Sequence, residues 1–178
     1  NVFVLELETL QVRQLTSELD AGRPAWSPDG RTIAYASNLQ REEHPFTLLP
    51  GFADTGLRDV RTVSVTGGTP TVVSGPINLE TLFFLPDGRL AWSVREIGPG
   101  GSMFQTTSRS RVEARAPSGT TTVLATVDGE IGRAALGPSG DGIYFGAKGD
   151  VQWLPWSGAA TPRGVRLQDA GKIGRAHV

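Results

Sequence analysis

The sequence contains no cysteine, and this absence excludes disulfide bridges, thiolate zinc sites and cysteine nucleophiles. It also lacks any run of about 20 apolar residues, which excludes an ordinary membrane-spanning helix. Neither sign of charge dominates, because 17 Lys and Arg residues face 18 Asp and Glu residues and leave a net charge of −1. Since nucleic-acid binding calls for a broad positive field, this balance argues against a nucleic-acid partner.

Glycine and proline are abundant, with 23 and 12 residues in a chain of 178. Such a density of helix breakers leaves little room for long helices and excludes a helical bundle. The chain is nevertheless 38% hydrophobic and 20% charged, so it has enough apolar material to bury and is not a disordered tail. Its length suits one domain or part of a larger one.

Three segments share one pattern: a short apolar run, a turn with proline and glycine, and a second β-rich run. Proline fixes φ early in a turn and glycine accepts a positive φ, so each segment is predicted to be a β-hairpin. In the third segment Asp141 and Gly142 are extra, which predicts a longer or bulged hairpin there. The turn residues are Pro28, Asp29 and Gly30 in the first segment, Pro86, Asp87 and Gly88 in the second, and Pro138 and Gly140 in the third.

A second hairpin is predicted upstream of each turn, and its position repeats. The leading strand of each of these hairpins ends 21 residues before the turn proline, at Leu7, Val65 and Pro117. A fourth leading strand is predicted over 151–156. Taken alone, residues 2–19 could also form a helix, but their register with two glycine-containing hairpins favours strands.

The repeating unit is therefore four short antiparallel strands, and the chain enters at the third strand of a unit. Four-stranded units that repeat at about 40–50 residues are the blades of a β-propeller. We predict an all-β fold, a partial β-propeller of about three and a half four-stranded antiparallel blades. The predicted blade segments are 2–16, 25–74, 82–126 and 134–168. Bulky aromatic residues are expected to pack between the blades: Trp26, Tyr35, Phe83, Phe84, Trp92, Tyr144 and Phe145.

At residues 13–16 and 25–34 the chain resembles the TolB-type propeller repeat, which has a Gln-Leu-Thr-like triplet followed by Ala-Trp-Ser-Pro-Asp-Gly-Arg-x-Ile-Ala. The second copy has Leu85 where that family prefers serine, and the third departs at Asp141 and Gly142. The resemblance covers residues 2 to about 168. It implies a closed ring of about six to eight blades, so we expect this chain to be a fragment that packs against the remaining blades of a longer parent chain.

The resemblance also implies what such a propeller does. TolB is a bacterial periplasmic protein that binds partner proteins through its propeller, which favours an extracytoplasmic location here. Similar propellers are attached, without catalytic residues of their own, to prolyl-oligopeptidase-like peptidases and to amidohydrolases.

The end of the chain differs from the rest. Residues 173–178 resemble the translation of a sequencing adapter, so they are expected to be non-native and the propeller fragment to be 1–172. The alternative is a frayed polar terminus.

Two long links join the second and third strands of successive blades, about residues 38–59 and 95–111. Loops longer than about 12–15 residues are usually functional or disordered, so we expect a recognition rim for a protein or peptide partner on that face. Solvated, variable loops without a ligand remain the alternative. The candidate partner-binding residues are Arg41, Glu42, Glu43, His44, Phe46, Phe52, Arg95, Met103, Phe104 and Arg109.

No catalytic or metal site is expected. Apart from His177 in the suspect tail, His44 is the only imidazole, and the sequence has no serine elbow, zinc motif or phosphate loop. Asp29 and Asp87 are expected to accept turn amide hydrogens. The predicted function is a non-enzymatic protein-interaction module without a cofactor; the alternative is the accessory propeller of a larger hydrolase that gates or positions substrate.

Overall fold

The structure is a computed structural model that describes residues 1–18, 20–37, 57–97, 108–131, 134–137, 139–147, 150–155 and 163–164. The described chain is all-β, and no helix within it is long and apolar enough to cross a membrane. Its strands are β1 (Phe3–Leu5), β2 (Val12–Gln14), β3 (Ala21–Trp26), β4 (Thr32–Ser37), β5 (Leu57–Ser64), β6 (Thr71–Phe84), β7 (Leu90–Ile97), β8 (Ser108–Arg115), β9 (Thr121–Asp128), β10 (Ala134–Leu136), β11 (Gly142–Ala147), β12 (Asp150–Pro155) and β13 (Arg163–Gly164).

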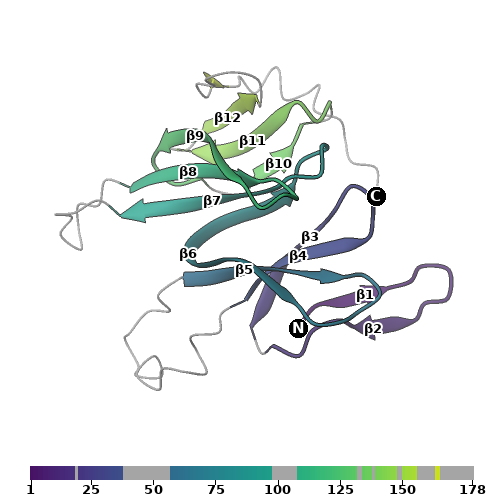
Figure 1. The fold of residues 1–178 in the computed structure, drawn as a ribbon. Helices are drawn as coiled ribbons and strands as arrows, with labels where there is room; N and C mark the ends of the chain where they lie inside the picture. Colours follow the sequence, from purple (N-terminus) through teal and green to yellow (C-terminus); the bar gives the residue numbers. More distant parts are fainter. Residues whose placement is uncertain are drawn as a thin grey trace.

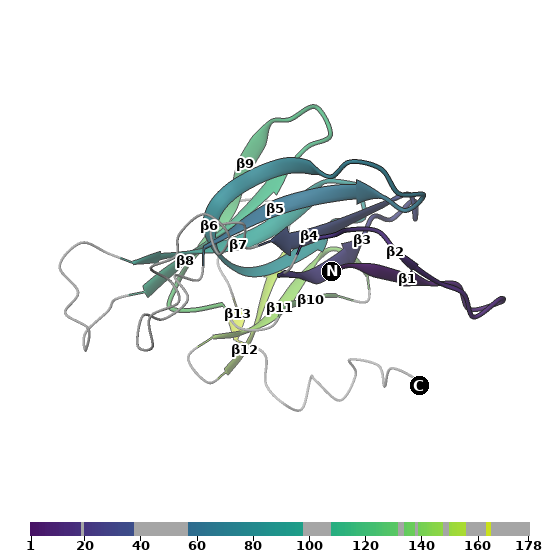
Figure 2. The ribbon, with the colours of Figure 1, turned by 90° about the horizontal axis from the view of Figure 1, so that it is seen from below.

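All strand pairs are antiparallel between neighbours in the chain, and they group into blades. The β1–β2 hairpin is followed by the set β3–β6, the set β6–β9 and the set β10–β13 (Figure 1). Seen from below, β10–β12 run in a direction different from that of β4 and β5 (Figure 2). The predicted all-β fold, a partial propeller of about three and a half four-stranded antiparallel blades, is confirmed. Residues 3–5 and 12–14 form strands rather than a helix.

Strand β6 belongs to two blades at once. Residues 71–78 pair with β5, and residues 79–84 pair with β7, so the chain passes from one sheet to the next without a loop. Figure 1 shows β6 curving between the two sheets. The sequence predicted a break between residues 74 and 82, and this prediction is wrong. Gly75 and Pro76 lie where the β5–β6 register shifts, and a bulge tolerates both residue types.

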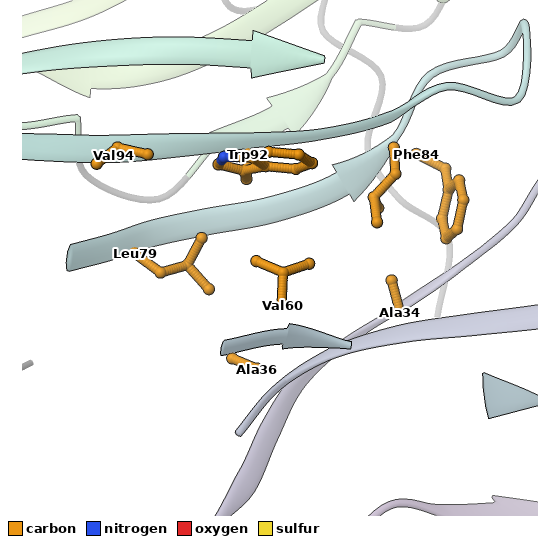
Figure 3. Close-up of a cluster of buried hydrophobic side chains, with 8 residues drawn as sticks. Ala34, Ala36, Val60, Leu79, Phe84, Trp92 and Val94 are labelled. Carbon is orange, nitrogen blue, oxygen red and sulfur yellow. The ribbon is translucent and has the colours of Figure 1, made fainter. Parts of the chain in front are cut away.

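Buried side chains lie between successive blades. Ala34, Ala36 and Val60 of the first blade face Leu79, Phe84, Trp92 and Val94 of the second in one apolar cluster (Figure 3). The second and third blades share a similar cluster, and the β1–β2 hairpin contributes Val2 and Leu15 against the outer face of β4 and β5. Since full burial of one such side chain stabilises by about 1.5–3 kcal/mol, each blade depends on its neighbours.

The first and third hairpin turns are built alike. In the first, the Ser27 N–H donates to the Thr32 carbonyl, and in the third the Gly137 N–H donates to the Gly142 carbonyl, at 2.9 Å in both. Gly30 and Gly140 have φ of 68° and 67°. The prediction of a longer third hairpin is therefore wrong relative to the first turn, because both connections span six residues, 27–32 and 137–142. The second turn, 85–89, is the shorter one.

Trp26 is a second correction. It was expected in the core, but 52% of its surface is exposed. Trp26 pairs with Ile33 and so faces the side of the sheet on which the β1–β2 hairpin packs. The short strands of that hairpin cover Ile33 and Tyr35 and leave the indole open. Of the other predicted core aromatics, Phe83 and Tyr144 are partly buried, and the rest are buried: Tyr35, Phe84, Trp92 and Phe145.

Candidate binding cleft between two blades

The predicted partner-binding residues lie mostly outside the described chain. Two of them are described: Arg95 near the end of β7 and Arg109 near the start of β8. Arg109 is exposed and lies 3.6 Å from Asp128. The predicted residues that fall outside the described ranges are Arg41, Glu42, Glu43, His44, Phe46, Phe52, Met103 and Phe104, and the turn residue Pro138 and the tail 173–178 fall outside them too.

Arg95 lines a cleft of about 700 Å³ where the first and second blades meet. The cleft lies near the start of β3 and of β5 and near the end of β7 and of β9, which is the face from which the long links emerge. We call it the link-face cleft. Its lining residues are Arg23, Pro24, Arg58, Asn78, Leu79, Glu80, Thr81, Leu82, Arg95, Glu130, Ile131 and Ala134.

Two β-bulges place charged residues in this cleft. The β3–β4 register shifts between Gly22 and Ala25, which puts Arg23 in the irregular stretch. The β6–β7 register shifts between Leu79 and Thr81, which puts Glu80 at the extra position. Because a bulge re-aims a side chain that regular alternation would send elsewhere, these two residues face the cleft from strands that are otherwise largely apolar.

Arg23 is held in an uncommon backbone conformation. Its φ is 54°, in the left-handed region that residues other than glycine seldom adopt. Such backbone costs about 1–3 kcal/mol and persists only where surrounding contacts hold it. Here an Arg23 guanidinium nitrogen donates to the main-chain carbonyl of Glu80 in the next blade. The contact directs the arginine across the junction between blades.

The other two arginines of the cleft are paired with carboxylates. Arg58 Nη1 lies 2.5 Å from Asp20 Oδ2, and Arg95 Nη2 lies 2.9 Å from Glu130 Oε2. Both pairs retain considerable solvent exposure, so each is expected to stabilise the fold by no more than about 1 kcal/mol. They hold two guanidinium groups at the rim of the cleft.

Glu80 is the most unusual group at this position. Both carboxyl oxygens are buried and have no hydrogen-bond partner within the described chain. The nearby Ser110 hydroxyl donates to the Gly129 carbonyl at 2.8 Å and accepts the Ile131 N–H at 3.2 Å, so both polar neighbours of Glu80 are engaged with each other. Burial raises the pKa of Glu80, and the proximity of Ser110 and Ile131 only partly offsets this effect.

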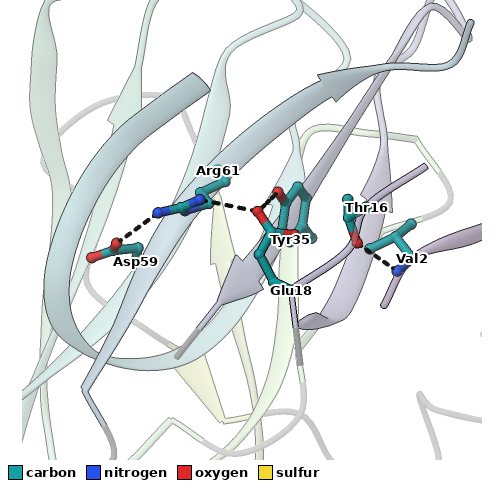
Figure 4. A network of polar contacts seen from close by, with 6 residues as sticks. All are labelled: Val2, Thr16, Glu18, Tyr35, Asp59 and Arg61. Atoms are coloured by element: carbon teal, nitrogen blue, oxygen red, sulfur yellow. Dashed lines mark hydrogen bonds and ion pairs between the residues drawn. The ribbon is translucent and has the colours of Figure 1, made fainter. Parts of the chain in front are cut away.

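A separate polar network fixes the segment that leads into β3. The Tyr35 hydroxyl donates to Glu18 Oε1 at 2.9 Å, and Arg61 Nη1 donates to the same oxygen at 3.0 Å (Figure 4). Arg61 also lies 3.5 Å from Asp59 Oδ2. Burial, then the Glu18 carboxylate, raises the pKa of Tyr35, so this tyrosine stays protonated. The network connects Glu18, which precedes β3 in the chain, to Tyr35 of β4 and Arg61 of β5.

The opposite face carries the turns. A second cleft, of about 570 Å³, is lined there by Pro28, Pro86 and Pro117 among other residues. The carboxylates of Asp29 and Asp87 accept the main-chain N–H groups of Arg31 and Arg89, at 3.1 and 3.0 Å. The Ser27 hydroxyl and then the Arg31 N–H lower the pKa of Asp29. These two carboxylates therefore serve the turns.

Sequence reasoning missed most of the cleft. Arg23, Arg58, Glu80 and Glu130 were not among the candidates, although Arg95 was. A usable signal was the alignment of the repeats on their turn prolines, which places Arg23 five residues before Pro28 and Glu80 six residues before Pro86. Arg23 and Glu80 are charged residues within strands that otherwise contribute side chains to the apolar core. Within the described ranges, no group of three or more metal-ligating side chains is gathered in one place.

Comparisons with known proteins place this geometry in a known fold. No protein-family profile and no curated protein sequence matches the chain. Among solved structures, a protein from Agrobacterium tumefaciens assigned as TolB superposes with a TM-score of 0.60 at 15% identity, over 86% of this chain and 51% of that one. The chain has the fold of a TolB-like β-propeller.

A second solved structure widens the comparison. An acylaminoacyl peptidase in complex with Z-Gly-Gly-Phe-chloromethyl ketone matches this TolB-like propeller with a TM-score of 0.56 at 12% identity, over 83% of this chain and 25% of that one. At such identities the likeness concerns the fold. The TolB-like chain described here spans about half the length of the first structure and a quarter of the second.

Proposed function

We propose that this TolB-like propeller is a non-enzymatic interaction module that binds a protein or peptide partner on its link face. The observation that carries the proposal is the link-face cleft, where Arg23, Arg58 and Arg95 from two adjacent blades line one cavity of about 700 Å³. Arginine is enriched at protein interfaces because its planar guanidinium can make several directed hydrogen bonds. The resemblance of the repeats to TolB-type propellers, which bind protein partners, supports the same interpretation.

The long links extend this surface in the proposal. Residues 38–56 and 98–107 connect strands whose ends border the cleft. Their candidate contact residues would form the rim around the arginines: Arg41, Glu42, Glu43, His44, Phe46, Phe52, Met103 and Phe104, with Arg109 beside them. A partner would then meet fixed charges in the cleft and aromatic side chains on the links.

Selection of displayed random peptides on the immobilised chain tests the proposal. A double variant, Arg23→Glu with Arg95→Glu, reverses charge in the cleft, and Arg31→Glu with Arg89→Glu makes the same charge change on the turn face as a matched control. We expect peptides selected on the unmodified chain to bind the cleft variant at least about tenfold more weakly and the control nearly unchanged. Equal loss in both variants, or no selection at all, would refute a binding site in the cleft.

The second candidate function is an accessory propeller of a larger hydrolase. It is favoured by the fold likeness to the acylaminoacyl peptidase, of which this chain matches a quarter. In that case the link face would position a substrate for a separate catalytic domain. The gene discriminates the two: a hydrolase domain encoded in the same protein favours the second function, and a propeller without one favours the first.

A further inference from the structure

The charges in the link-face cleft do not cancel evenly. Arg58 and Arg95 are each paired with a carboxylate, from Asp20 and Glu130 respectively. The contact of Arg23 within the described chain is with a main-chain carbonyl oxygen, which carries no full charge. Among the described residues of the cleft, Arg23 is therefore the cation that is not paired with a carboxylate.

Glu80 does not supply the missing negative charge. It offers Arg23 its main-chain carbonyl, while its two carboxyl oxygens are buried and accept no hydrogen bond from the described residues. Arginine has five N–H donors in a rigid fork, and Arg23 is an exposed residue at the mouth of the cleft. Donors of its guanidinium thus remain available toward the cavity.

On this basis we propose that the link-face cleft is a carboxylate-binding site. Its central binding residue is Arg23, and it binds one carboxylate group of a peptide partner. The inference rests on the proposed function and specifies its chemistry. An arginine fork and a carboxylate have matched geometry and form two parallel, charge-assisted hydrogen bonds. The β-bulge and the bond to Glu80 hold the guanidinium before a ligand arrives, which lowers the entropy cost of binding.

A monoanion fits this cleft better than a phosphate group. A phosphomonoester carries about −1.5 to −2 charge at neutral pH and calls for more than one uncompensated cation. Glu130 and the buried Glu80 line the same cleft as Arg23, and acidic groups in the cleft disfavour a dianion. The carboxylate can come from an acidic side chain or from the carboxyl terminus of the partner, since both present the same group.

Isothermal titration calorimetry with defined peptides tests the inference and separates the two sources. The probes are an acetylated hexapeptide amide, Gly-Ser-Ala-Glu-Ala-Gly, its counterpart with Gln in place of Glu, and the Gln peptide with a free carboxyl terminus; inorganic phosphate is the fourth probe. We expect one or both carboxylate-bearing peptides to bind at least about tenfold more tightly than the neutral amide. Tighter binding of phosphate than of every peptide would overturn the carboxylate assignment.

Variants assign the effect to Arg23. Arg23→Gln should abolish the preference for the carboxylate, and Arg31→Gln, on the turn face, should retain it. Arg23→Gly is the second test variant, because glycine adopts the left-handed backbone at this position without strain and preserves the bulge. If both Arg23 variants fold and still prefer the carboxylate-bearing peptides, Arg23 is not the residue that binds the carboxylate.

The outcomes distinguish this inference from the proposed function. If displayed peptides are selected on the cleft but neutralising each of their carboxylates leaves affinity unchanged, the binding module stands and the carboxylate site is refuted. If the defined peptides show no preference for a carboxylate, and no displayed peptide depends on the cleft for binding, both the carboxylate site and the proposed binding function are refuted.

Discussion

Gly142 offers a sharp test of how the third blade is packed. It takes the place that Thr32 has in the first hairpin, but Trp153 of the neighbouring strand leaves no room for a side chain there. A Cβ added at Gly142 would lie 2.5 Å from Cη2 and 2.6 Å from Cζ2 of Trp153, and it would also meet the Leu154 carbonyl oxygen. The indole is not free to withdraw, because it lies against Tyr144 with ring centroids 4.6 Å apart.

The expected size of the effect follows from two opposing contributions. Overpacking of this kind costs about 1–3 kcal/mol, because backbone or ring must move. Replacing glycine by alanine also restricts the unfolded chain, which stabilises the protein by about 0.4–1 kcal/mol. Gly142→Ala should therefore lower the free energy of unfolding by roughly 1–2 kcal/mol. At about 2–4 °C per kcal/mol for a domain of this size, Tm should fall by about 2–8 °C.

Gly146 in the same strand is the matched control. An added Cβ there meets nothing within 4 Å, and no positive φ is present at this position. Gly146→Ala should leave Tm unchanged or raise it slightly. Thermal melts followed by circular dichroism compare the two variants, and tryptophan fluorescence reports any displacement of Trp153. A Gly142→Ala protein that melts at or above the temperature of Gly146→Ala would refute the packing described for this blade.

Two further predictions concern the core and the cleft. Trp92 is 1% exposed between two blades whereas Trp26 is 52% exposed, so Trp92→Ala should cost about 3–5 kcal/mol and Trp26→Ala less than about 1 kcal/mol in urea unfolding; similar losses would contradict the burial of Trp92. Because burial raises the pKa of Glu80, the native state keeps a proton that the unfolded state releases, and stability falls as pH rises through that interval. Glu80→Gln should therefore be more stable than the unmodified chain near pH 8 and lose this advantage near pH 4, by melts at both values; an advantage that grows on acidification would reverse the assigned sign.

The parts of the fold that sequence could predict are those set by local backbone chemistry. Pro28, Asp29 and Gly30 specify a turn through the φ values they allow, and their recurrence near Pro86 and Pro138 revealed the blades. Glycine and proline, as at Gly75 and Pro76, occur both in turns and in bulges, so only the pairing with β5 shows that the strand continues through residues 75 and 76.

The parts that sequence could not predict depend on neighbours far along the chain. Trp26 fits the family repeat closely, yet its burial is set by what packs on its side of the sheet, and the β1–β2 hairpin does not cover it. Arg23 and Glu80 are in contact because register shifts in two different strands, β3 and β6, lie at the same junction between blades. No local sequence pattern predicts that these two positions come together. Arg95 was found because its long link stood out by length.

Because β6 belongs to two sheets, the first two blades should separate from each other less easily than the third blade separates from them. Since β6 is hydrogen-bonded to both β5 and β7, the first two sheets can separate only if the backbone hydrogen bonds to β5 or those to β7 break. Among the described strands, β9 and β10 belong to separate sheets, and an apolar cluster packs the last sheet against the one before it. Partial unfolding should thus begin at the C-terminal sheet: β10–β13 should detach while the sheets β3–β6 and β6–β9 remain paired.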